Sequence, residues 1–160
     1  MSDTNESEKS RSKLYDMVVR GKTYRETLDF EMFGEEVEVV LRPLVDAEFL
    51  PITALMQELL DIDEEEAIEQ IREAKEEAEK EHGEGAPIDI SVFDEDFVLL
   101  MQKAAKLGID GESMGHTQEE VDFMVENMVG GYSVELGGEV LDLAGDIRDA
   151  ERFRGRGASR

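Results

Sequence analysis

Two stretches of the sequence place acidic side chains at the alternate spacing that a calcium-binding loop requires. Such a loop needs oxygen ligands at alternate positions, glycine at its sixth position and glutamate at its twelfth. The stretch that begins at Asp61 has Glu66 and Arg72 at those two positions, so it can neither turn nor close around an ion. The stretch that begins at Asp110 has the glycine but reaches Val121 at its twelfth position. We interpret both stretches as helix caps and solvated faces, and we predict no metal site.

Other residue types that carry chemistry are rare or scattered. The chain has no cysteine, which excludes disulfides, thiolate zinc clusters and a cysteine nucleophile. Its two histidines, His82 and His116, fall in different expected loops and do not have the spacing of zinc ligands. The glycine pairs at 130–131 and 137–138 follow no strand and have no basic neighbour, so they do not predict a phosphate-binding loop. Among 41 carboxylates no pair is marked for acid-base work. The sequence therefore predicts a protein that is not an enzyme and uses no cofactor.

The net charge of the chain is strongly negative. The 160 residues include 41 Asp and Glu against 17 Lys and Arg, a formal net charge of −24. Such a surface repels itself at low ionic strength, whereas at about 1 M salt the Debye length falls to about 3 Å and the repulsion is screened. Arginine outnumbers lysine and large aromatics are few, a composition that resembles haloarchaeal proteins. We therefore expect a halophilic, cytoplasmic protein of a high-salt cell, with no membrane segment, because no apolar stretch approaches the roughly 20 residues of a membrane helix.

The distribution of charged and apolar residues predicts one acidic central domain between two terminal segments. Residues 26–147 hold 35 acidic and 6 basic residues, and both flanking segments are mildly basic. The sequence predicts a disordered N-terminal arm over 1–13, a single acidic domain over 14–150 with length for one modest core, and a flexible Arg/Gly tail over 151–160. We do not expect nucleic acid as a partner of the tail, because phosphate binding by so few arginines falls steeply with salt.

An alternation of apolar and polar residues predicts a β-hairpin over 23–42. The pair Gly34-Glu35 has glycine first, which is typical of a two-residue type II′ turn. This register places the apolar side chains on one face and the acidic ones on the other. The expected apolar pairs are Met32 with Val37, Phe30 with Val39, and Leu28 with Leu41. Because a two-stranded hairpin is not stable alone, its apolar face must meet helices or the strands of another subunit.

Capping residues and helical periodicity predict about five helices over 46–153. Asp63 is expected to cap a helix over 64–82 that has only a narrow apolar stripe and so projects into solvent or contacts a partner. Thr117 begins the capping box of a later helix. Ser133 can cap the last helix, which its glycines weaken. The expected fold class is α+β and mostly helical, with an N-terminal β-hairpin followed by about five α-helices.

Two segments carry a resemblance to a known family. The run from Val37 to Phe49, with Arg42-Pro43-Leu44 at its centre, resembles the strand, R-P-L motif, acidic cap and helix start of the tail assembly chaperones of tailed phages. The segment 125–147, a helix, a short glycine loop and a final Val-Leu-Asp-Leu-Ala helix, is similar to the way those proteins end. With the halophilic composition, the resemblance points to a tailed virus or provirus of a haloarchaeon.

The resemblance implies a protein-binding assembly factor. Such chaperones coat the long helical tape measure protein and recruit tail tube subunits, so these viral tail proteins are the expected partners. Methionines supply adaptable apolar surface for binding a helix, and an edge strand over 23–32 could pair with a tube subunit or with a second copy, which would be self-association. The residues that we assign to protein binding are Phe30, Met32, Val37 and Val39 on the hairpin and Met124 and Met128 on a late helix.

Two alternative functions remain open. A virion structural part, such as a tail or connector subunit, would use the hairpin for lateral pairing and would remain in purified particles. An acidic host regulator or nucleic-acid mimic would associate with a basic host protein, and that association would weaken as salt rises. Apolar assembly contacts would instead strengthen in kosmotropic salt.

Overall fold

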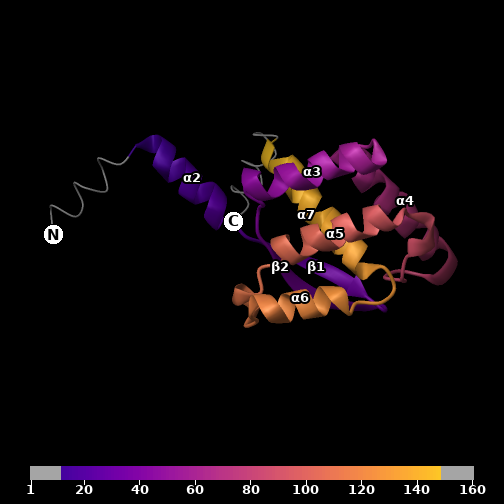
Figure 1. Ribbon diagram of the computed structural model, residues 1–160. Coiled ribbons are helices and arrows are strands. Elements are labelled where there is room, and N and C mark those ends of the chain that lie inside the picture. The colour runs from indigo at the N-terminus through magenta and orange to yellow at the C-terminus, as the bar shows by residue number, and fades with distance from the viewer. Residues whose placement is uncertain (1–11, 149–160) are drawn as a thin grey trace.

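The computed structural model describes residues 12–148, and within them a two-stranded antiparallel sheet is followed by a layer of helices (Figure 1). The elements are α2 (Lys13–Thr23), β1 (Glu26–Met32), β2 (Glu35–Leu41), α3 (Asp46–Leu60), α4 (Glu64–His82), α5 (Glu95–Gly108), α6 (Gln118–Glu126) and α7 (Tyr132–Arg148). Two short 3-10 turns precede α5 and α6. The expected α+β, mostly helical class with a hairpin ahead of the main helices is confirmed.

The N-terminal part of the domain differs from the expectation in one respect. Residues 13–23 form the helix α2, which the sequence analysis did not predict, and the hairpin therefore begins at Glu26. Ser12 caps α2, since its side-chain oxygen accepts a hydrogen bond of 3.1 Å from the backbone N–H of Tyr15. The rest of the expected arm and the expected tail over 151–160 lie outside the described residues.

The hairpin turn lies one residue earlier than predicted, so the prediction of a Gly34-Glu35 turn is wrong. Phe33 and Gly34 form the two-residue turn, with φ values of 53° and 81°. Two consecutive positive φ values are typical of a type I′ turn, which matches the twist of the strands. The register shifts by two residues, so that Phe30 faces Val37 and Leu28 faces Val39. Because side chains alternate with a period of two, this shift leaves every residue on the predicted face.

A buried tyrosine from the last helix holds the turn in place. Tyr132 is fully buried, and its ring makes edge-to-face contacts with Phe30 and Phe33, at centroid distances of 5.9 and 5.0 Å. Its hydroxyl accepts a hydrogen bond of 2.8 Å from the backbone N–H of Phe33 and donates one of 2.6 Å to the carbonyl of Gly85. The tyrosine thus joins the hairpin tip to the loop after α4 and stabilises the unusual backbone conformation of Phe33.

The core is centred on α5, which packs against α7, α3 and α6, while α4 packs on α7. Two glycines permit the close approach of α5 and α7. A Cβ atom on Gly137 would overlap the backbone carbonyl oxygen of Met101, and one on Gly108 would overlap the side chain of Val140. The glycine pair that the sequence analysis read as a weakness of the last helix therefore includes a helix-packing position.

Asp63 and Thr117 cap their helices as predicted, whereas Ser133 does not cap the last helix. The side chain of Asp63 accepts a hydrogen bond of 2.8 Å from the N–H of Glu66, and α4 spans the predicted residues 64–82. Thr117 forms its capping box at the start of α6. Ser133 does not cap α7, because the helix begins one residue earlier and the carbonyl of Gly131 accepts its first hydrogen bonds.

Candidate protein-binding surfaces

The four hairpin residues assigned to protein binding separate into two groups. Phe30 and Val39 are only 4% and 9% exposed and lie in the core. Their side chains stabilise the fold and leave little area for a partner, and their assignment to protein binding stays a prediction. Met32 is half-buried against the same core, whereas Val37 is 39% exposed near the hairpin tip. Among the four, Val37 is the one with substantial area open to a partner, and its role in binding stays a prediction.

The late helix carries a more exposed apolar residue than the two methionines chosen on it. Met124 and Met128 are both half-buried, and Met128 lies beyond the last residue of α6. Phe123 is 65% exposed, and it lies with Met124 beside Glu119 and Glu120 in a shallow groove of about 220 Å³. Phe123 is not among the predicted binding residues because acidic residues surround it in the sequence, although its position opposite Val121 and Val125 on the helix indicates the outer face.

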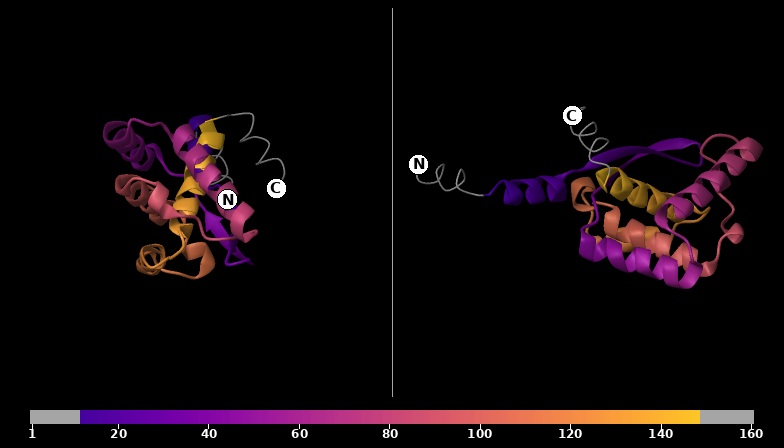
Figure 2. Two further views of the ribbon diagram at one scale, coloured as in Figure 1. Left: turned by 90° about the vertical axis from the view of Figure 1, so that its right-hand side faces the viewer. Right: turned by 90° about the horizontal axis from the view of Figure 1, so that it is seen from above.

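The most exposed apolar surface belongs to α2. None of its 11 residues is buried, and Leu14, Met17 and Val18 are 73%, 50% and 59% exposed. These three and Gly21 follow the spacing i, i+3, i+4 and i+7, which places them on one face of a helix. Figure 2 shows α2 extending away from the rest of the molecule. This helical spacing of apolar residues is the sequence signal for α2, but the pattern covers only residues 14–21 and basic residues interrupt it.

Basic residues flank the apolar stripe of α2 on both sides. At 100° per residue, Lys13 and Arg20 fall on one side of the stripe and Lys22 on the other, while Asp16 lies away from it. The helix is therefore a small, basic and amphipathic element in a chain whose net charge is strongly negative. This combination is typical of a helix that lies in an acidic, apolar groove.

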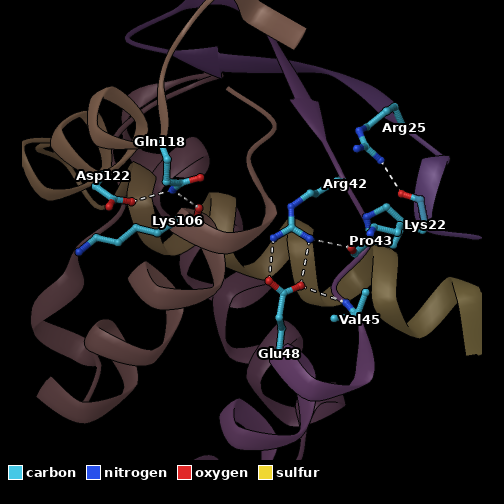
Figure 3. A network of polar contacts seen from close by, with 9 residues as sticks. All are labelled: Lys22, Arg25, Arg42, Pro43, Val45, Glu48, Lys106, Gln118 and Asp122. Atoms are coloured by element: carbon cyan, nitrogen blue, oxygen red, sulfur yellow. Dashed lines mark hydrogen bonds and ion pairs between the residues drawn. The ribbon is translucent and has the colours of Figure 1, made fainter. Parts of the chain in front are cut away.

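A polar groove of about 760 Å³ lies where α2, β2 and the start of α6 meet, and Figure 3 shows its network of contacts. Arg42 makes a two-pronged ion pair with Glu48, at 2.9 and 2.8 Å, and Glu48 also accepts a hydrogen bond of 3.1 Å from the backbone N–H of Val45. These hydrogen bonds hold the pKa of Glu48 below its ordinary value of 4.5, against the opposing effect of its burial. The R-P-L motif thus connects β2 to the N-terminus of α3.

Other side chains around this groove also make contacts within the chain. Arg25 donates to Asp110 at 2.5 Å and to the carbonyl of Lys22 at 2.8 Å. Gln118 donates to the carbonyl of Lys106 at 3.0 Å and to the carboxylate of its own helix neighbour Asp122 at 2.8 Å. The groove therefore contains the ion pairs of Arg42 with Glu48 and of Arg25 with Asp110, and these pairs connect successive or distant elements of the chain.

We expect Glu48→Gln to lower stability at neutral pH by about 1 kcal/mol, a discounted value because the pair is partly exposed to solvent. The folded-state pKa of Glu48 is depressed, so its contribution is present above the unfolded value near 4.5 and is lost as pH falls through the lower folded value. The stability difference between wild type and variant should therefore shrink in acid. Thermal unfolding at several pH values tests this. Glu58→Gln, an exposed position on the same helix, is the control and should show no such difference.

A second cavity, of about 210 Å³, lies between α4 and α7 and contains a buried carboxyl group. Glu135 is 5% exposed; its Oε1 lies 3.7 Å from Nζ of Lys75, and its Oε2 is buried without a hydrogen-bond partner in the described part of the chain. Burial raises the pKa of Glu135 to about 7, with added repulsion from Glu79 and Glu139, while Lys75 opposes the rise. No sequence signal predicts this buried carboxyl group, since nothing in the residues near Glu135 distinguishes it from the other glutamates.

Comparisons with protein-family models, with curated proteins and with solved structures find no match to this chain. Over residues 12–148, no group of three or more histidine, aspartate or glutamate side chains is arranged to hold a metal ion. In the same residues no helix combines the length and the apolar character needed to cross a bilayer. An assignment of function therefore depends on the exposed surfaces described above.

Proposed function

We propose that this protein is a non-enzymatic, protein-binding assembly factor, resembling a viral tail assembly chaperone that binds tape measure and tail tube proteins. The observation that carries the proposal is α2, an amphipathic helix without a single buried residue. An isolated helix of about this length is only marginally stable in water, so a partner that covers its apolar face would stabilise it. A long helical protein with an exposed apolar stripe is a partner of the right kind, because two such stripes can cover each other.

The hairpin supports a second contact in the same function. The C-terminal end of the outer edge of β2 is occupied, since the N–H of Arg42 donates to the carbonyl of Gly108 and the N–H of Asp110 donates to the carbonyl of Val40, both at 2.8 Å. β1 pairs with β2 on one side, and its sheet contains no third strand within residues 12–148. An edge strand of this kind can accept a strand from a tail tube subunit by β-addition.

The charge of the chain suits the proposed setting. A net charge of −24 is tolerable when molar salt screens it, which supports the cytoplasm of a high-salt host as the working compartment. In the same salt, apolar contacts strengthen while exposed ion pairs weaken. The binding surfaces of such a protein should therefore depend on apolar side chains, as the stripe of α2 does.

The test is a pull-down from a haloarchaeal lysate that contains the viral tail proteins, in about 2 to 3 M salt so that exposed charges stay screened. Wild type is compared with Leu14→Asp, which charges the α2 stripe near the helix N-terminus, where an acidic residue does not harm the helix. The control is Leu99→Asp, at an apolar residue of α5 that is 55% exposed. Circular dichroism should be equal for all three proteins.

We expect wild type and the Leu99 variant to recover a tape measure or tail tube protein, and the Leu14 variant to recover at least about tenfold less, as expected for a contact worth about 1.4 kcal/mol. Recovery of only basic host proteins or nucleic acid would overturn the proposal in favour of an acidic regulator. Finding the protein as a stoichiometric component of purified particles would overturn it in favour of a virion structural subunit.

A further inference from the structure

We propose that two copies of this chain associate by exchanging α2 helices, with the apolar stripe of α2 from each copy docked on the outer face of α6 of the other. The inference rests on the proposed function, because it assigns a second binding partner, another copy of this chain, to the helix α2 that is proposed to bind tail proteins. Self-association of this kind covers the stripe while no tail protein is present.

The outer face of α6 is complementary in charge to the stripe of α2, because its apolar centre lies between acidic residues. Phe123 is 65% exposed at its centre. At 100° per residue, Glu119 lies on one side of Phe123 and Glu120 on the other. The nine residues of α6 include four acidic residues and no basic one, whereas α2 has three basic residues and one acidic. Each helix thus has an apolar centre between charges, and the signs of these charges are opposite.

The two faces also match in size and accessibility. At 1.5 Å per residue, α2 is about 16 Å long and α6 about 14 Å, so the stripes can overlap over most of their length. Gly21, at the C-terminal end of the stripe, lines a groove of about 330 Å³ together with Phe49 and Ile147 of its own domain, so the stripe is most open to a partner toward its N-terminal end. The aromatic ring of Phe123, which is 65% exposed, is a large apolar group that can pack on the exposed side chains of Leu14 and Met17. The N-terminal part of α2 extends away from its own domain (Figure 2), and Leu14 and Met17 are 73% and 50% exposed there, so a second domain can approach this part of the helix.

A reciprocal exchange explains why a second copy is the favoured occupant. Each chain carries one basic stripe and one acidic face, so a pair related by a two-fold axis forms the same contact twice and leaves neither face open. At low ionic strength two copies of this strongly negative chain repel each other, and the basic residues of α2 beside the acidic face of α6 oppose that repulsion. In molar salt the apolar contact between Phe123 and the stripe remains when the charges are screened.

The test is the mass of the purified protein by sedimentation equilibrium, over a concentration series in about 2 to 3 M salt. We expect a monomer-dimer equilibrium for wild type. Met17→Glu on α2 and Phe123→Glu on α6 should each shift the dissociation constant upward by at least about tenfold, because each places an unpaired charge in an apolar contact. Leu99→Glu is the matched control and should behave as wild type. A monomeric wild type at all concentrations would overturn the inference.

Mixing the two single variants separates this arrangement from others. In a mixed dimer both altered surfaces fall in the same contact, and the second contact joins an unaltered α2 to an unaltered α6. We therefore expect the mixture to form more dimer than either variant alone. If α2 instead paired with α2, or α6 with α6, the mixture would gain no such intact contact between different helices. A mixture that stays as monomeric as its two components would contradict the proposed exchange.

The failure of this inference can be distinguished from failure of the proposed function. A monomeric protein that still recovers tape measure protein would retain the function and remove the exchange. A dimer that depends on Met17 and Phe123 but recovers no tail protein would support the exchange of α2 helices and contradict the proposed function.

Discussion

Gly137→Ala is expected to destabilise the protein by at least about 3 kcal/mol, the upper part of the range for overpacked cores. A Cβ atom at this position would overlap the backbone carbonyl oxygen of Met101 on α5. A backbone atom within a helix cannot rotate away as a side chain can, so α5 and α7 would have to separate. Because their contact forms the centre of the core, the expected result is a large fall in the midpoint of thermal unfolding, measured by circular dichroism.

Gly145→Ala on the same helix is the matched control for this substitution. No atom lies within 4 Å of a Cβ placed on Gly145, and alanine is favoured over glycine within a helix by about 1 kcal/mol. The control should therefore raise the unfolding midpoint slightly while Gly137→Ala lowers it. If both substitutions stabilised the protein, the close crossing of α5 and α7 would not be the reason for glycine at position 137.

Glu135→Gln is expected to stabilise the protein by about 3 kcal/mol at pH 8 and to have little effect at pH 4. The folded-state pKa of Glu135 is about 7, against an ordinary value of 4.5. Between these values the folded chain holds a proton that the unfolded chain has released, so the stability of wild type falls as pH rises through this window. Above pH 7 the full cost of the buried charge is present, and a difference of 2.5 pKa units corresponds to about 3 kcal/mol. Glutamine keeps the shape of the side chain without that charge.

The measurement is thermal or denaturant unfolding of both proteins from pH 4 to pH 8. Many other carboxylates titrate in this range, so the informative quantity is the difference in free energy of unfolding between variant and wild type. That difference should grow with pH and level off above about pH 7, the pKa of Glu135. Glu119→Gln, on the exposed face of α6, is the control and should give a flat difference. A flat difference for Glu135→Gln would show that the carboxyl group is better solvated than its burial indicates.

The sequence by itself determined the elements whose signals are local. The side chain of Asp63 and that of Thr117 cap their helices through backbone groups three residues away, so the starts of α4 and α6 follow from composition and spacing alone. The faces of the hairpin were also predictable, because alternation survives a register shift of two residues.

The tertiary structure decided the features that depend on residues far apart in the chain. Phe33 occupies the turn because Tyr132, 99 positions later, accepts a hydrogen bond from its backbone and packs on its ring. Gly137 is a packing position because the backbone of α5 passes beside it, and Glu135 is distinguished from other glutamates by burial against α4. The packing of the helices also decides that Phe30 lies in the core and that no residue of α2 is buried. Spacing along the chain cannot encode these outcomes, since burial and close contact are properties of the assembled helices and their neighbours.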